Sequence, residues 1–202
     1  MLPLENGEPN TPVSDSDIKH PGTSGIWIFV FIDMVVFALF FLLFVSERHR
    51  LPDIFTTSQA LLDPRVGLLG TLLLITSSSF VADAVHSVRK GKIQRARVSL
   101  ELAILLGLGF CVNKLVEYGD KFSHDISPVT NGFFTFYFLI TGLHFLHVIG
   151  GLCFLGHCRM RIAVEGSEFA YRKKIENTGL FWHFVDLLWL FIFPMLYLTG
   201  VQ

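Results

Sequence analysis

Charged side chains are scarce in this chain of 202 residues: they make up 16% of it, against about 25% in a typical soluble domain. The net charge of −1 provides no basic face of the kind that a nucleic-acid-binding protein needs. The three cysteines, an odd number without a CxxC pair, argue against a disulfide framework and a cysteine zinc site. An apolar content of 51% and a mean hydropathy of +0.55 indicate instead a polytopic membrane protein.

Several sequence patterns are also missing. Apolar and polar residues do not alternate with period 2, which excludes the usual pattern of a membrane β-barrel. No internal repeat supports an inverted-repeat transporter. The chain has no nucleotide-binding loop, no His-Glu-x-x-His motif and no Ser/His/Asp arrangement at an informative spacing. We therefore expect no catalytic centre and no metal site in the chain itself.

Long apolar runs dominate what is present, and crossing a bilayer takes about 20 helical residues. Five runs are long enough, and they predict an all-α bundle of five transmembrane helices. Their approximate ranges are 25–46, 66–88, 98–118, 131–157 and 178–200. The polar, proline-containing stretch 1–24 is expected to be a short disordered tail rather than a signal peptide, and 25–202 the membrane domain.

The distribution of basic residues predicts the orientation of the chain in the membrane. Eleven of the sixteen Lys and Arg residues lie in the tail and in the loops after the second and fourth runs. Cytoplasmic loops carry an excess of Lys and Arg, so the sequence predicts a cytoplasmic N-terminus and a C-terminus on the outer, periplasmic side.

Ionisable groups within the apolar runs need a reason, since each costs roughly 2.5–3.5 kcal/mol on insertion scales. At 1.5 Å per residue, Asp33, His147 and Asp186 lie at similar depths on three different spans. We expect these three side chains to face the bundle interior together. His144 and His183, each three residues from a member of this set, extend the predicted intramembrane polar cluster. Ser77, Ser78 and Ser79 can form hydrogen bonds across helices, and Gly142, Gly150 and Gly151 permit close helix packing.

This cluster has more than one interpretation. The histidines could bind haem or a metal, and the carboxylates could relay protons. The simpler interpretation is a hydrogen-bonded group that fixes the register of the helices.

Four further ionisable residues lie nearer the ends of the apolar runs: Asp83, Glu101, Lys114 and Glu117. Lys114 and Glu117 are three residues apart, so we expect an ion pair at the membrane interface with Lys114 extending outward to water. Trp27, Tyr118 and Tyr197 lie where an aromatic belt is expected.

Two segments resemble a known family. Residues 141–151, TGLHFLHVIGG, resemble the TGxHxxHVxxG signature of subunit III of haem-copper oxidases, and residues 182–189, WHFVDLLW, resemble its YWHFVDxxW. Glu117-Tyr118 and the segment 74–80, LITSSSF, also look like family features. The resemblance covers roughly 22–200 and implies the short, five-helix bacterial form, located in the inner membrane.

In that family, subunit III has no haem or copper of its own. The resemblance therefore implies a non-catalytic accessory subunit of a respiratory oxidase that receives electrons from cytochrome c or quinol and pumps protons. The catalytic subunit I, which holds the haem and copper, and subunit II are the implied partners. Phospholipid bound between the helices and support of proton uptake are implied as well.

Two positions depart from the family pattern. Asp33 stands where a Glu is usual, and Lys114 stands where Gln is frequent. Both resemble the subunit III-like proteins associated with nitric oxide reductases, which makes such a reductase an alternative partner. A free-standing transporter or a haem-binding membrane protein is the alternative of another class.

Overall fold

Five long helices form the molecule in this computed structural model, which describes residues 23–166 and 168–198. They are α1 (Ser24–Arg50), α3 (Pro64–Arg89), α4 (Ile93–Ser123), α5 (Gly132–Glu165) and α6 (Phe169–Phe193), the last continued by the π-helical η1 (Pro194–Leu198). All five, α6 together with η1, are long and apolar enough to cross a membrane. The predicted all-α bundle of five spans is confirmed, whereas nearly all of the expected tail, 1–22, lies outside the described residues.

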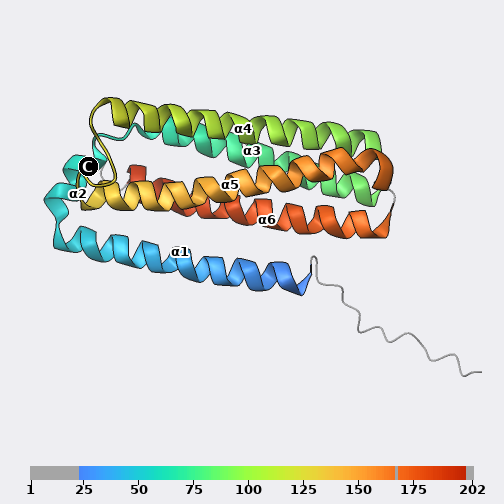
Figure 1. Ribbon diagram of the computed structural model, residues 1–202, viewed down its shortest axis with the longest axis horizontal. Coiled ribbons are helices and arrows are strands. Elements are labelled where there is room, and N and C mark those ends of the chain that lie inside the picture. Colours follow the sequence, from blue (N-terminus) through green and yellow to red (C-terminus); the bar gives the residue numbers. More distant parts are fainter. Residues whose placement is uncertain (1–22, 167, 199–202) are drawn as a thin grey trace, which may run out of the picture.

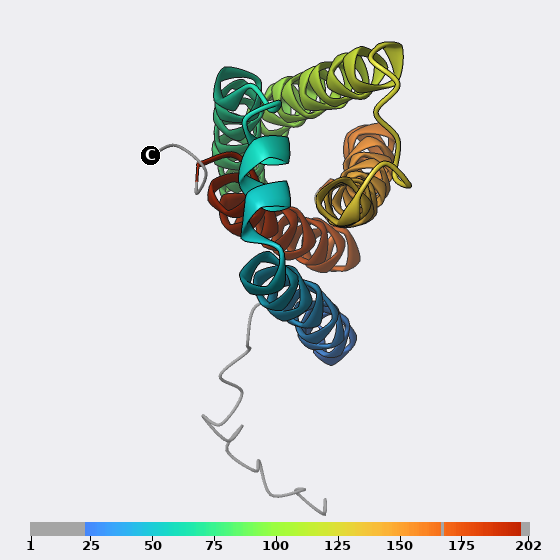
Figure 2. The ribbon, with the colours of Figure 1, turned by 90° about the vertical axis from the view of Figure 1, so that its left-hand side faces the viewer.

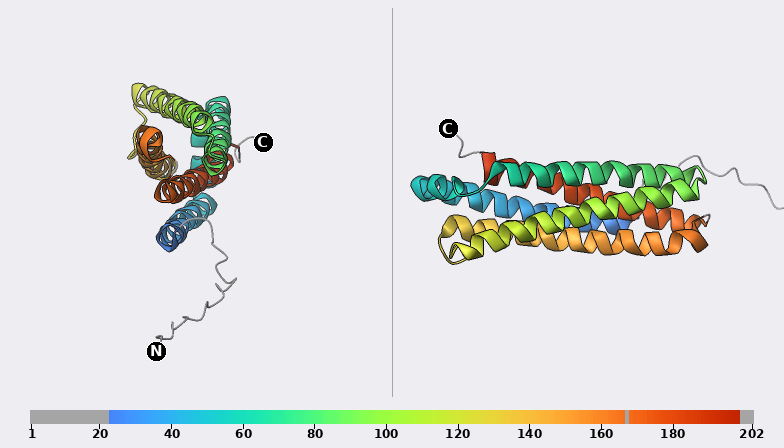
Figure 3. Two further views of the ribbon diagram at one scale, coloured as in Figure 1. Left: turned by 90° about the vertical axis from the view of Figure 1, so that its right-hand side faces the viewer. Right: turned by 90° about the horizontal axis from the view of Figure 1, so that it is seen from above.

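The helices run lengthwise beside one another (Figure 1). Helices α3 and α4 form one antiparallel pair and α5 and α6 another, with α3 also packing on α6 and α4 on α5. Helix α1 lies outside this group of four, against α5 and α6 (Figures 2 and 3). We call the end where α3 meets α4 and α5 meets α6 the basic end, and the other end the α2 end.

Local sequence signals explain where several helices begin. The Asp63 side chain accepts a hydrogen bond from the backbone N–H of Arg65, and Pro64 occupies the first helical position of α3. The Asn131 side chain accepts one from the N–H of Phe134 at the start of α5. Gly91 has a φ of 71° in the tight turn between α3 and α4, a conformation that favours glycine.

A short helix, α2 (Pro52–Gln59), occupies the connection between the first two spans, where the hydropathy pattern predicts only a loop. It lies across the bundle end, where the Phe55 ring packs on Phe44 and Phe133. The Gln59 amide donates to the carbonyl oxygen of Leu196 in η1 at 2.7 Å. Helix α2 thereby ties the outer ends of α1, α5 and η1 together.

Helices α5 and α6 extend well beyond the predicted spans at the basic end. Polar residues there lower the hydropathy without disfavouring a helix, and pairs such as Arg161–Glu165, four residues apart at 3.1 Å, support the added turns.

Helices α4, α5 and α6 pack closely where two glycines face the Trp182 ring. A Cβ atom on Gly151 of α5 would lie 2.6 Å from the Trp182 ring of α6, and one on Gly107 of α4 would lie 3.0 Å from the same ring. At Gly142 and Gly150, by contrast, a Cβ atom would meet nothing within 4 Å. Close packing, predicted for Gly142, Gly150 and Gly151 of α5, is thus found at Gly151 alone among these three.

Candidate functional site

Asp33 of α1 and His147 of α5 lie together inside the membrane-spanning part of the bundle. The Asp33 Oδ2 atom is 3.2 Å from His147 Nε2, and both side chains are mostly buried. The rings of Phe29, Phe37 and Phe181 surround the imidazole. The common depth of Asp33 and His147 thus corresponds to a contact between α1 and α5.

The second ring nitrogen defines what this pair can do. His147 Nδ1 is 2.8 Å from the carbonyl oxygen of Leu143, and a carbonyl only accepts hydrogen bonds, so Nδ1 carries a hydrogen. Asp33 Oδ2 forms no hydrogen bond among the described residues, so the 3.2 Å contact is an ion pair only when Nε2 carries a further proton. The arrangement is chemically able to hold and release a proton.

Asp186 is at the expected level on α6 but does not join this pair. It is 17 residues from Phe169, and His147 is 18 residues from Glu165, which places both about 26 Å from the basic end. Phe181 is the residue of α6 that packs against His147. Asp186 follows it by five residues, about 140° around the helix, and therefore lies on the α3 side. The expectation that Asp33, His147 and Asp186 meet is wrong because depth does not fix the face.

His183 also lies on the α3 side of α6, and it is exposed rather than directed into the bundle. Its Nδ1 atom forms a hydrogen bond with the Ser78 hydroxyl of α3. Ser78, His183 and Asp186 line the same surface groove. Asp186 is 7% exposed, and its carboxylate oxygens have no hydrogen-bond partner in the part of the chain that the structure describes.

His144 is separate from both groups. It is fully buried, its ring stacks at a tilt on Trp189 and meets the Phe110 ring edge-on. Neither ring nitrogen has a hydrogen-bond partner among residues 23–166 and 168–198. The five predicted residues therefore occupy three places: the Asp33–His147 pair, the groove with His183 and Asp186, and the core position of His144.

Lys114 and Glu117 form the predicted ion pair, with Nζ 3.0 Å from Oε2. The predicted extension of Lys114 outward to water is wrong, because Lys114 is 1% exposed and Glu117 is 7% exposed. Helix α4 continues nine residues beyond Lys114 to Ser123, so the lysine lies about 14 Å inside the helix end and cannot reach water by extending outward.

Two tyrosines complete this buried group. The hydroxyls of Tyr137 and Tyr197 donate to Glu117 Oε1 at 2.8 and 2.6 Å, and Lys114 Nζ donates to the Tyr197 oxygen at 2.7 Å. The Lys114 Nζ atom also lies 5.0 Å from the Trp189 ring centre and 5.1 Å from that of Tyr137. Such cation–π contacts favour the ammonium form in an apolar setting. The network joins α4, α5, α6 and η1.

The other two predicted residues form ion pairs near the basic end. Asp83 Oδ1 lies 2.6 Å from Arg95 Nη2, and Asp83 also accepts from the Ser99 hydroxyl. Glu101 pairs with Arg159 and lies 3.8 Å from Arg97. These contacts tie α3 to α4 and α4 to α5, as structural ion pairs do.

Sequence reasoning missed Tyr137 and Tyr197 as polar partners. Tyr197 was expected in the aromatic belt, yet it is 1% exposed, because η1 turns its ring into the bundle toward Glu117. The cross-helix role of the serines was predictable: Ser77 donates to the Ala103 carbonyl of α4 at 2.8 Å, and Ser78 contacts α6. No group of three or more His, Cys, Asp or Glu side chains is placed to hold a metal among the described residues.

Comparison with known proteins adds to this geometry. The family described as cytochrome c oxidase subunit III matches residues 15–201. Quinol oxidase subunit 3 of Bacillus subtilis is 28% identical, over 100% of this chain and 98% of its own length. Cytochrome bo(3) ubiquinol oxidase subunit 3 of Buchnera aphidicola is 29% identical, with 88% and 93% covered. Cytochrome c oxidase subunit 3 of Alkalihalophilus pseudofirmus is also 29% identical, with 88% and 86% covered.

These relatives are oxidase subunits by name, and they give no support to a nitric oxide reductase partner. The match spans all five long helices and both histidine-containing segments. The chain belongs to the cytochrome c oxidase subunit III family.

Proposed function

We propose that this chain is a non-catalytic accessory subunit of a bacterial haem-copper respiratory oxidase. The observation that carries the proposal is the family match over residues 15–201. The catalytic subunit I would hold the haem and copper, and subunit II would complete the complex. Its relatives belong by name to quinol and cytochrome c oxidases, so either compound is a suitable electron donor for the complex.

The chain is proposed to lie in the inner membrane with its N-terminus in the cytoplasm. The support is the charge asymmetry: the connections from α3 to α4 and from α5 to α6, at the basic end, adjoin most of the Lys and Arg residues. In this orientation the Asp33–His147 pair lies nearer the cytoplasmic end of α1. A pair that holds a proton at this depth suits a role in supporting proton uptake by the complex.

Bound phospholipid is the second contribution that we propose. A crevice of about 460 Å³ opens between the start of α1 and helices α5 and α6. Phe154, Phe181 and Ile26 line its apolar part, and Lys173 and Lys174 line its polar part at the basic end. An acyl chain against the rings and an anionic headgroup against the lysines would satisfy both parts.

The accessory role is tested by purifying the complex through an affinity tag on this chain, in mild detergent. We expect a haem-containing catalytic subunit to co-purify in stoichiometric amount. Removal of this chain from the purified complex by harsher detergent should leave the haem absorption entirely with the remaining subunits. Absence of any haem protein from the purified material, or a Soret band that stays with this chain, would overturn the proposal.

A further inference from the structure

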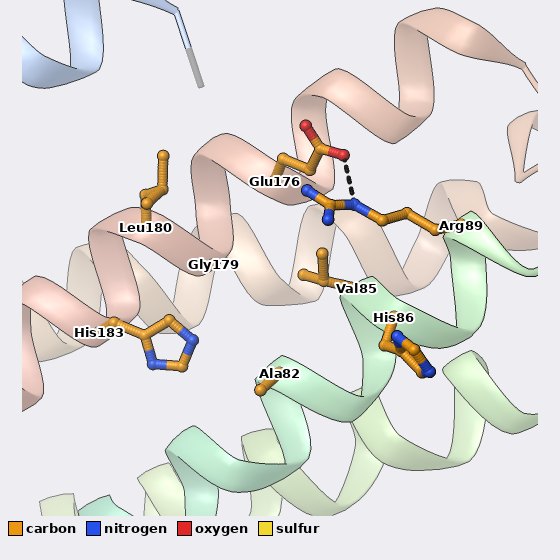
Figure 4. Close-up of a pocket in the computed structure, with 8 residues that line it drawn as sticks. All are labelled: Ala82, Val85, His86, Arg89, Glu176, Gly179, Leu180 and His183. Atoms are coloured by element: carbon orange, nitrogen blue, oxygen red, sulfur yellow. Dashed lines mark hydrogen bonds and ion pairs between the residues drawn. The ribbon is translucent and has the colours of Figure 1, made fainter. Parts of the chain in front are cut away.

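A groove runs along the outer surface between α3 and α6. It consists of two hollows of about 220 and 400 Å³ that share Ala82 and His183. Figure 4 shows the residues that line the smaller one. It extends from the Arg89–Glu176 ion pair at the basic end to Ile75 and Leu190. Each helix contributes fifteen residues to this length, and the fourteen rises between them correspond to about 21 Å. The groove thus covers a large part of a hydrocarbon core of about 30 Å.

The outward side chains of the groove are spaced as in helix–helix interfaces. On α3 the exposed residues Ile75, Ser79, Ala82, His86 and Arg89 recur every three or four positions. This spacing keeps one seam facing a partner helix over several turns. Ser79 and Ala82 have small side chains, which allow a neighbouring backbone to approach closely.

His183 is the feature that lipid does not explain. Its exposed imidazole lies five residues, about 7.5 Å, inside the start of the apolar run 178–200, where a bilayer offers mainly acyl chains. Its Nδ1 is bonded to Ser78, while its Nε2 has no partner in the described segments 23–166 and 168–198. Beside it lies the buried, unpartnered carboxylate of Asp186, which lines the same groove. Acyl chains offer these groups no hydrogen-bond partner, whereas a protein helix can present a polar side chain there.

We propose that this groove docks a transmembrane helix of the catalytic subunit, with His183 hydrogen-bonded to a polar side chain of that helix. The inference rests on the accessory function proposed above and adds the face and the chemistry of the contact. The Arg89–Glu176 pair lies at the basic end of the same groove, where it can meet polar residues of the docked helix outside the hydrocarbon.

Photo-cross-linking tests whether the groove between α3 and α6 is the docking face. A photoreactive phenylalanine analogue is introduced at one position at a time in the tagged complex. Ala82 and Leu187 report on the groove. Leu105 and Val112 of α4, exposed by 65% and 60%, report on another membrane-facing surface. We expect cross-links to the catalytic subunit from positions 82 and 187 and none from 105 and 112. Any other pattern overturns the inference, including lipid adducts alone from the groove. Co-purification of the catalytic subunit with the wild-type chain is measured separately. If co-purification fails, the accessory role is wrong; if it succeeds without cross-links from the groove, the catalytic subunit docks on another face.

The hydrogen bond is tested by comparing His183→Leu with His183→Gln. Glutamine retains a polar group at this depth, so we expect the Gln variant to stay in the complex as the wild type does. The Leu variant should show about threefold lower retention during detergent purification, the scale of one lost hydrogen bond between membrane helices. Equal retention of both variants would contradict the proposed contact. Membrane levels of each variant before extraction control for folding.

Discussion

Lys114 shows how the surroundings of one residue depend on partners far away in the chain. The spacing to Glu117 is enough to predict the ion pair, because residues three apart share a helix face. Burial is not predictable in this way, since Tyr197, which closes the site, comes 83 residues later and from a π-helical segment. The tyrosine hydroxyls and the aromatic rings compensate for two charges that would otherwise be costly in a membrane interior.

Replacing Lys114 by Met should therefore destabilise the protein strongly. The substitution leaves the Glu117 carboxylate buried without its cation, and breaking a buried pair in this way costs about 3–5 kcal/mol. Thermal unfolding of the detergent-solubilised complex measures the effect. The matched control is Lys90→Met, at an exposed position, where little change is expected. A Lys114→Met melting curve that superimposes on the control would show that the pair contributes nothing.

The Asp33–His147 contact makes a prediction about coupling. Asp33→Leu and His147→Leu each remove one partner of the same 3.2 Å contact. The double variant should lose less stability than the sum of the single losses, by about 0.5–3 kcal/mol, as expected for residues in direct contact. A double-mutant cycle on unfolding free energies supplies the number. Strictly additive losses would mean that the two side chains do not interact.

At the scale of elements, hydropathy predicts what a membrane requires and little else. All five spans correspond to helices, because a bilayer demands long apolar segments with satisfied backbones. Helix α2 is too short and too polar to give a hydropathy signal, and contacts of Phe55 and Gln59 with distant helices hold it in place. The added turns of α5 and α6 were missed for the same reason: polar helical turns outside the apolar runs carry no membrane signal.

The α5–α6 interface gives a test with neighbouring glycines. Gly151→Ala places a methyl group 2.6 Å from the rigid Trp182 ring, so the helices must separate. Overpacking of this kind costs about 1–3 kcal/mol. Gly150→Ala meets nothing within 4 Å and should be neutral or slightly stabilising, because Ala favours a helix. The melting temperatures of the two variants measure the difference. A Gly150 variant as unstable as the Gly151 variant would contradict the close contact between Gly151 and Trp182.

The crevice between α1, α5 and α6 yields a prediction about lipid. Exchanging both Lys173 and Lys174 for Gln removes the positive charge at its polar end. Each basic residue near an anionic lipid surface contributes about 1 kcal/mol, so anionic phospholipid should be depleted from the purified complex. Lipid mass spectrometry provides the measurement, with the double variant Lys90→Gln and Lys92→Gln as a control of equal charge. Unchanged anionic lipid relative to that control would exclude the crevice as the site.

At the scale of the whole molecule, the sequence predicts the level of each polar residue better than its face. Asp186 and His147 share a depth, but α6 presents Phe181 to His147 and directs Asp186 and His183 toward α3. The face depends on how each helix is rotated against its neighbours, which side-chain packing across the bundle decides. That rotation leaves polar groups on an outer groove, as expected of a subunit that completes its surface in a complex.

The central claim is that this chain supports a catalytic partner and supplies no redox centre. The most direct measurement is to delete the chain, isolate the remaining oxidase, and record its haem and copper signals and its activity over many turnovers. The account predicts intact signals and a near-normal initial rate, followed by faster loss of activity or of proton pumping than in the complete complex. Loss of a haem or copper signal on deletion would contradict it.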